Sequence, residues 1–143
     1  MADEYETFIH RWFEEVWNQR NESSIDEMFA EDGVANGLND PEGNPLRGPE
    51  GFKTLFRSFT SAFPDLKITV EDTVIEGDKI AARCRVTATH NGHGVGVAPT
   101  NRPVEFSGMT IVQVKDGKIT EAWNEFDFMK MYQTLGALTL DLQ

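Results

Sequence analysis

The sequence predicts an α+β fold, with helices in the first half of the chain and an antiparallel sheet in the second. Up to residue 63 the apolar side chains recur at helical spacing, whereas from Leu66 onward β-branched residues alternate with short turns. With 143 residues, the chain suits a single domain over 1–143 that needs no disulfide to form its core. Three helices and an antiparallel sheet together define the α+β class.

Each expected helix has its own signal. Over residues 5–17, seven apolar residues share one helical face, opposite acidic residues and Arg11. A short helix is expected from Ser23 or Ser24, whose hydroxyl can cap it, to the neighbourhood of Gly33. A third begins at the Pro49–Glu50 pair and ends before Pro64. Residues 37–51 are rich in Gly, Pro, Asn and Asp, and we expect a loop there.

Four strands are expected in the second half, over residues 66–75, 80–90, 104–114 and 119–128. The pairs Gly77-Asp78 and Asp116-Gly117 are typical of two-residue hairpin turns, which fix the pairing of the flanking strands. The last residues, 129–143, are expected to form a helical turn followed by a tail.

An uninterrupted ladder from the Asp116-Gly117 turn decides which side chains share a face. It pairs Lys115 with Lys118 and, counting outward, Val112 with Glu121, Thr110 with Trp123, Gly108 with Glu125 and Phe106 with Asp127. Asp127 is therefore expected on the more apolar side of the sheet. The same count from Gly77-Asp78 places His90 at the end of a face formed by Ile80, Ala82, Cys84, Val86 and Ala88.

Asp127 and His90 are the candidate chemical groups. A carboxylate held against aromatic rings has its charged form disfavoured, which raises its pKa and suits it to take and return a proton. A nearby imidazole could orient the carboxylate or stabilise an oxyanion. The residues alone leave open that Asp127 is an exposed carboxylate and that His90 is structural. His10 and His93 are expected to have no chemical role.

Composition and motifs exclude several function classes. The net charge of −11 disfavours binding to nucleic acid or to an anionic membrane surface, and no apolar run is long enough to span a membrane. The N-terminus has no basic residues ahead of an apolar stretch, which favours a cytoplasmic location. Cys84 is the single cysteine and is expected to be buried. No metal-ligand spacing, nucleotide motif or cofactor motif is present, so we predict no metal and no cofactor.

Several segments resemble the SnoaL-like polyketide cyclases, also called ester cyclases, of the nuclear transport factor 2-like superfamily. They are EEVWNQRN at 14–21, GPEGFK at 48–53, AFPDLKITVED at 62–72 and the long segment at 89–127 that begins THNGHG and ends EAWNEFD. The ending QTLGAL at 133–138 resembles the family's habitual glutamine-leucine-glycine ending.

This resemblance implies a cone-shaped α+β barrel, in which a strongly bent antiparallel sheet and N-terminal helices enclose one pocket. It also implies cofactor-independent chemistry on a hydrophobic carbonyl compound, with Asp127 of EAWNEFD as acid/base in an intramolecular aldol-type cyclisation. His90 of THNG resembles a pocket histidine of that family. The substrate-binding residues expected from facing and from the resemblance are Trp12, Asn36, Phe56, Phe106 and Trp123.

Other functions remain open at this stage. One is a non-catalytic protein that binds a hydrophobic small molecule, and another is an assembly module. A ketosteroid isomerase-like site is disfavoured because Asn36 stands where its base would fall, and an epoxide hydrolase-like site because Arg83 and Arg85 are expected to point away. We also expect a homodimer through a mixed sheet face that carries Met109, Ile111, Phe126 and Phe128.

Overall fold

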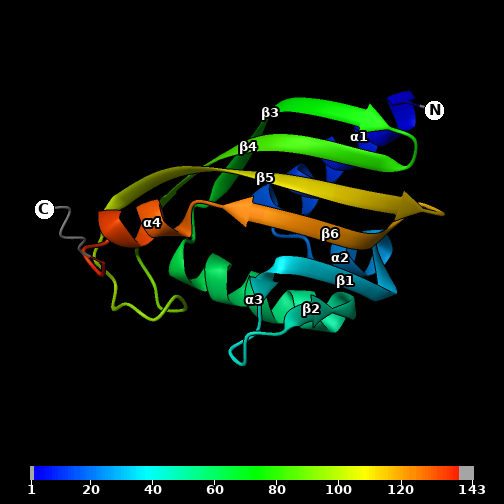
Figure 1. Ribbon diagram of the computed structural model, residues 1–143. Helices are drawn as coiled ribbons and strands as arrows, with labels where there is room; N and C mark the ends of the chain where they lie inside the picture. The colour runs from blue at the N-terminus through cyan, green and yellow to red at the C-terminus, as the bar shows by residue number, and fades with distance from the viewer. Residues whose placement is uncertain (1, 139–143) are drawn as a thin grey trace, which may run out of the picture.

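The computed structural model describes residues 2–138, which form a curved six-stranded sheet with three helical segments across one face (Figure 1). In chain order the elements are α1 (Ala2–Arg11), the π-helix η1 (Trp12–Asn18), α2 (Glu22–Met28), β1 (Phe29–Asn39), β2 (Pro45–Arg47), α3 (Gly48–Ala62), β3 (Lys67–Glu76), β4 (Lys79–Thr89), β5 (Pro103–Lys115), β6 (Lys118–Phe126) and α4 (Phe128–Thr134).

The sheet has the strand order β2-β1-β6-β5-β4-β3. Its pairs are antiparallel except β1 with β6, which are parallel. The predicted α+β fold with a bent sheet is therefore confirmed, with one parallel pair and with the sheet open at its β2 and β3 edges. In Figure 1, α3 lies across the β1 end of the sheet and α4 follows β6 at the opposite end from the β5–β6 turn.

Strands β1 and β2 were not predicted from the sequence, and β2 falls inside the expected loop at 37–51. The β1 segment FAEDGVANGLN has no alternation of apolar and polar residues. It is a strand because it pairs with β6 on one side and β2 on the other. Pairing and burial in the folded sheet here outweigh weak local strand propensity.

The first predicted helix changes its winding at Trp12. Residues Ala2–Arg11 are α-helical, whereas Trp12–Asn18 form a π-helix. A π-helix has i→i+5 hydrogen bonds, so residues about five positions apart lie on one side. Trp12 and Trp17 are thereby placed on the same inward side, and both are buried.

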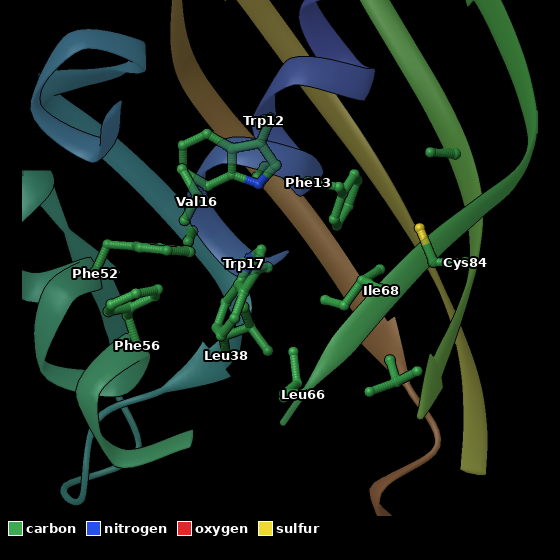
Figure 2. Packing of buried hydrophobic residues seen from close by; sticks show 14 of the residues in the cluster. Trp12, Phe13, Val16, Trp17, Leu38, Phe52, Phe56, Leu66, Ile68 and Cys84 are labelled. Carbon is green, nitrogen blue, oxygen red and sulfur yellow. The ribbon is translucent and has the colours of Figure 1, made fainter. Parts of the chain in front are cut away.

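The core lies between the helices and the concave side of the sheet. Figure 2 shows Trp12, Phe13 and Trp17 between Phe52 and Phe56 on the α3 side and the strand residues on the other. Three edge or tilted ring contacts join η1 to α3: Trp12 to Phe52 at 5.2 Å, Trp17 to Phe52 at 5.9 Å and Trp17 to Phe56 at 5.3 Å between centroids. Such pairs each add about 0.5–1.5 kcal/mol beyond the burial of their area.

The β5–β6 hairpin follows the predicted register only near its turn. Lys115 pairs with Lys118 and Val114 with Ile119, as predicted. Gln113 then pairs with Glu121, which leaves Thr120 as an additional residue in β6. This is a β-bulge. Because side chains alternate between the two faces of a strand, one additional residue moves every later β6 side chain to the opposite face from the one predicted.

The predicted pairs Thr110–Trp123, Gly108–Glu125 and Phe106–Asp127 are therefore wrong. Thr110 pairs with Asn124 and Gly108 with Phe126. Asn124 and Phe126 face the helices, whereas Trp123 and Glu125 are exposed on the outer face. Phe126 has room to lie inward because Gly108 has no side chain, since a Cβ there would lie 2.1 Å from Phe126 Cδ2.

A second bulge lies in β3. An unbroken count from the Gly77-Asp78 turn pairs Ile75 with Ile80, Thr73 with Ala82 and Glu71 with Cys84. The first two pairs are present, but Cys84 pairs with Val70. The extra residue, Glu71, points its carboxylate at two arginines of β4, accepting from Arg83 Nη1 at 3.0 Å and Arg85 Nε at 3.1 Å. The ladder between β4 and β5, by contrast, runs from Lys79–Gln113 to Thr89–Pro103 without a shift.

Candidate functional site

A narrow apolar cavity of about 60 Å³ lies between the helices and the sheet. Its walls come from η1, β1, α3, β3, β4, β5, β6 and the start of α4. The lining residues are Trp12, Phe13, Trp17, Phe29, Leu38, Phe52, Leu55, Phe59, Leu66, Ile68, Val86, Phe106, Thr110, Val112, Ile119, Ala122, Asn124, Phe126 and Phe128. Among these side chains, the uncharged polar groups are Thr110, Asn124 and the two indole N–H groups.

Thr110 and Asn124 form a hydrogen-bonded pair within this apolar lining. The Thr110 hydroxyl donates to Asn124 Oδ1 at 2.8 Å, and Asn124 Nδ2 donates to the backbone carbonyl of Asn36 at 3.0 Å. β1 can approach β6 this closely because Gly37, at φ +83°, has no side chain, and a Cβ there would lie 1.9 Å from the Asn124 carbonyl oxygen. The Asn124 amide is therefore held between the Thr110 hydroxyl of β5 and the Asn36 backbone of β1.

Hydrogen-bonding capacity remains on these groups for a ligand. An amide nitrogen has two N–H groups, and one of those on Asn124 is used by the Asn36 carbonyl. The indole N–H groups of Trp12 and Trp17 have no hydrogen-bond partner within residues 2–138. In Figure 2 the indole nitrogen of Trp12 lies on the side of the ring toward Phe13. The cavity thus combines an apolar surface with a few fixed donors, which suits a ligand that carries a carbonyl oxygen.

Behind this pair, Asn36 connects the cavity wall to Glu121. Asn36 Nδ2 donates to Glu121 Oε2 at 3.0 Å and to the Ala122 carbonyl at 3.1 Å. Asn36 itself does not line the cavity. Asn36 was expected to contact the substrate. It instead supports the cavity wall, because its backbone carbonyl fixes the amide of Asn124.

Asp127 lies outside the cavity, in contrast to the position expected from the uninterrupted ladder. Its carboxylate caps α4 by accepting from the Lys130 backbone N–H at 3.0 Å, and its own backbone N–H donates to the Ser107 carbonyl at 2.9 Å. The side chain is exposed and borders a shallow outer hollow with Arg83 and Glu125. The bulge at Thr120 is the physical reason, because it exchanges the two faces of β6.

His90 is fully buried, as the predicted face requires, but it also does not line the cavity. Its Nδ1 accepts from the Thr100 backbone N–H at 3.2 Å and lies 3.0 Å from the Thr100 hydroxyl, while its ring packs on Phe63 at 5.4 Å. Its Nε2 is buried without a hydrogen-bond partner in the described part of the chain.

Burial lowers the pKa of His90, and the nearby His93 lowers it further, while the Val97 backbone opposes the shift. The imidazole is therefore neutral at physiological pH. It closes the base of the loop after β4, where the His90 backbone also pairs with Asn101 and Arg102. The structure does not bring His90 and Asp127 together on one cavity.

The other expected contact residues divide by position. Trp12 and Phe106 line the cavity. Phe56 is buried behind the lining against Trp17. Trp123 is 37% exposed on the outer face, with Lys79 Nζ 5.7 Å from its ring centroid.

Sequence reasoning missed Thr110, Asn124, Phe126 and Phe128 as lining residues. Phe126 and Phe128 were assigned to the outer face by the same error that placed Asp127 inside. One signal for the bulge does exist in the sequence: Ile119 and Ala122, which are both buried, are three residues apart, whereas a regular strand requires two or four.

Neither the single thiol nor a metal centre contributes to this site. Burial raises the pKa of the Cys84 thiol to about 12, so the thiol stays protonated at neutral pH. Residues 2–138 contain no group of three or more His, Cys, Asp and Glu side chains that could hold a metal ion. In that same range, every helix is too short or too polar to cross a membrane.

The curved sheet, the covering helices and the apolar cavity between them define an α+β protein of the nuclear transport factor 2-like superfamily. The model of the SnoaL-like polyketide cyclase family matches residues 7–135. The chain therefore belongs to the SnoaL-like polyketide cyclase family, as the sequence resemblance indicated.

Solved structures agree with this assignment. IdmH from Streptomyces antibioticus, described as a candidate polyketide cyclase, is 34% identical, with 92% of this chain and 97% of that chain covered and a TM-score of 0.79. AclR from Streptomyces galilaeus, described as a candidate hydroxylase, is 28% identical over 98% of this chain and 89% of its own, with a TM-score of 0.82. Among curated proteins, none matches the sequence significantly.

Proposed function

We propose that the cavity binds a hydrophobic carbonyl compound and promotes cofactor-independent acid/base chemistry of the intramolecular aldol type. The observation that carries this proposal is the Thr110–Asn124 pair set into an otherwise apolar, aromatic lining. Family membership, and the similarity to a structure described as a candidate polyketide cyclase, agree with this substrate class.

The proposed role of the polar groups is to hold the carbonyl oxygen. In an aldol cyclisation a base removes an α-proton, the enolate carbon attacks a second carbonyl carbon of the same molecule, and the resulting alkoxide takes a proton back. Negative charge develops on oxygen at both stages. The free N–H of Asn124 and the Trp12 indole N–H are donors that are fixed before the reaction, and fixed donors stabilise such charge well where water is excluded.

Asp127 is the acid/base proposed from the sequence, and in its present position the carboxylate must move before it can reach a ligand. It stands between Phe126 and Phe128, which both line the cavity, but its carboxylate is directed to the Lys130 N–H at the start of α4. To act on a bound ligand, the carboxylate has to leave this cap and turn past Phe128. His90, packed against Phe63 and bonded to Thr100, has the proposed role of holding the adjoining loop and not of touching the ligand.

A second candidate function is favoured by one observation: in the described part of the chain, no carboxylate or imidazole lines the cavity. A protein with this lining can bind a hydrophobic carbonyl compound without converting it. The two candidates share the binding site and differ in whether proton transfer to and from the ligand is accelerated.

Deuterium exchange at the α-carbon of 2-tetralone distinguishes the enzyme from the non-catalytic binding protein. Binding of 2-tetralone is measured separately, by quenching of tryptophan fluorescence. For the enzyme, exchange in D₂O followed by proton NMR is faster with the wild type than in buffer. Thr110→Val and Asn124→Leu then lower the rate roughly 100- to 1,000-fold, in the range known for lost oxyanion donors. Binding with no acceleration establishes the non-catalytic candidate, and no binding refutes both.

The role of Asp127 is judged in the same assay. Asp127→Asn keeps a good helix cap, so the fold is retained while the base is removed. Exchange at the buffer rate supports Asp127 as acid/base. Exchange at the wild-type rate removes that assignment and leaves the carbonyl-binding proposal in place.

We also propose a homodimer through the outer face of the sheet. Met109 is 54% and Ile111 44% exposed there, close to Trp123, with which Ile111 pairs. Phe126 and Phe128, expected on this face, point inward instead. Light scattering should report a dimer that Ile111→Lys converts to a monomer, and a monomeric wild type contradicts the proposal. The proposed compartment is the cytoplasm, for which fractionation of expressing cells is the test.

A further inference from the structure

A second hollow, an outer cleft of about 930 Å³, adjoins the cavity on the far side of α3. It is formed by residues 39–42 and 44–47, one side of α3, Gly94, Val95 and Tyr132. Tyr132 Oη donates to the Val95 carbonyl at 2.8 Å, and the Gly92 N–H donates to the Ala62 carbonyl at 3.1 Å. The loop after β4 is thereby attached both to α4 and to the end of α3, beside which it lies in Figure 1.

Leu55 and Phe59 line both the apolar cavity and the outer cleft. They are four residues apart on α3, so their side chains lie next to each other on one face of the helix. Both are half-buried. The ring of Phe59 contacts Phe128 at 5.6 Å between centroids, and Phe128 contacts Phe106 at 6.1 Å. These two side chains are the wall between the two hollows.

Size shows that the cavity alone is too small for a ligand of the proposed class. The cavity measures only about 60 Å³. Sites for small organic ligands usually measure about 300–1,000 Å³. The outer cleft lies within that range. A cyclisable carbonyl compound must therefore displace the wall and extend into the cleft.

The side chains of the cleft indicate which chemistry the extending part has. Thr54 and Ser58 donate their hydroxyl hydrogens to the backbone carbonyls four residues earlier, both at 3.2 Å, so their oxygens remain acceptors. Within residues 2–138 the exposed Arg47 guanidinium has no hydrogen-bond or salt-bridge partner. Asp40 Oδ1 already accepts from the backbone N–H groups of Glu42 and Asn44. The cleft also holds the exposed Glu42 carboxylate, so acceptors outnumber the one cationic donor, and such a surface suits the hydroxyl hydrogens of a neutral, hydroxylated chain.

We infer that the ligand has two parts: an apolar ring ketone that enters the cavity, and a hydroxylated chain that lies in the outer cleft, with Leu55 and Phe59 determining which ring systems pass between them. This inference rests on the proposed function, since it takes the ring ketone as the occupant of the cavity. It adds the second half of the site and the two residues that set its specificity.

The test compares two ligands that differ only in the chain: 2-acetyl-6-methoxynaphthalene and the same ketone with a 6-hydroxyhexyloxy group in place of methoxy. Fluorescence titration measures Kd for each. The chain should tighten binding to the wild type about five-fold or more, which is about 1 kcal/mol. Thr54→Trp, or Ser58→Leu if that variant does not fold, fills the cleft and should abolish this advantage, so that the two ketones bind that variant with the same Kd within about two-fold.

The wall is tested by association rates in stopped-flow fluorescence. Leu55→Ala and Phe59→Ala should each raise the association rate of the methoxy ketone several-fold, and Phe59→Leu serves where Phe59→Ala does not fold. Val74→Ala, which shortens an exposed side chain of β3, is the matched control and should leave the rate unchanged.

The failures are distinguishable. If neither ketone binds the wild type, the proposed function fails and takes the two-part ligand with it. If the methoxy ketone binds but the chain adds nothing, or the wall variants associate at the wild-type rate, the carbonyl-binding proposal stands and the two-part ligand is refuted.

Discussion

The β4–β5 and β5–β6 ladders share strand β5 but transmit register differently. β4 and β5 pair over their whole common length without a shift, whereas β6 contains the additional residue Thr120 within three residues of its first pair. On the β4 side, a count of alternate residues correctly places His90 inside. On the β6 side, the same count exchanges the inner and outer residues. A single bulge therefore decides which chemical groups the cavity contains.

Inserting one alanine after Ala122 should have the largest effect, because it places Trp123 opposite Thr110 and Glu125 opposite Gly108, where both side chains face the helices. Burying a carboxylate without a partner and exposing Phe126 should cost at least about 4 kcal/mol, enough to unfold a domain of this size or greatly lower its Tm. Thermal unfolding followed by circular dichroism measures this. Thr120→Ala keeps the bulge and loses the hydroxyl bond to the Gln113 carbonyl, so it should cost only about 1 kcal/mol. Equal losses in the two variants would contradict this account of register.

Gly108→Ala should have the next largest effect. The new methyl group would lie 2.1 Å from Phe126 Cδ2, so the ring must move out of the cavity wall or the strands must separate. Overpacking of this kind costs about 1–3 kcal/mol in the free energy of unfolding, measurable by urea titration. The neighbouring Ser107→Ala, on the exposed face, is the control and should change stability by less than about 0.5 kcal/mol. A stable Gly108→Ala would mean that Phe126 does not occupy the inner face.

Asp127→Ala should cost about 1 kcal/mol through loss of the α4 cap, whereas Asp127→Asn should be close to neutral because asparagine caps a helix as well as aspartate does. Chemical denaturation of both variants gives the two values. If both variants are neutral, the carboxylate is not engaged at the cap and is free to turn toward the ligand, which strengthens its proposed role as acid/base.

The smallest expected effect is a loss of stability at low pH that is caused by His90. Its pKa in the folded protein lies below the usual value of about 6.5, so protons bind the unfolded chain more strongly. This stabilising contribution is complete above about pH 6.5 and is lost as the pH falls toward the folded-state pKa. The free energy of unfolding at pH 7.5 and 5.5 should therefore differ less for His90→Gln than for the wild type, while His10→Gln, at an exposed helix position, should retain the wild-type difference.

Much of the fold follows from local patterns, and the site does so only in part. Helical periodicity predicts the inward positions of Trp12 and Phe52, and the two hairpin turns predict the central strands. Strand β1 depends on pairing with β6, which no local pattern records. The cavity residue Asn124 depends on the bulge. The periodicity of β6 is broken between Ile119 and Ala122, but a count that starts at the turn passes over this break, and every later residue is then assigned to the wrong face.

The π-helix at Trp12–Asn18 and the bulges at Glu71 and Thr120 have a common origin in chain length. Each accommodates one residue more than the regular helix or ladder needs, and each lies in an element that lines the cavity. Within such a family, the contents of the cavity can therefore change by insertion or deletion of one codon in a wall element, a step that substitution alone could match only by altering many positions together. Alignments of relatives that keep these elements ungapped would hide such events. A gap at Thr120 itself only restores the regular ladder, so the informative one-residue gaps in β6 are those after Ala122, which exchange its inward and outward side chains.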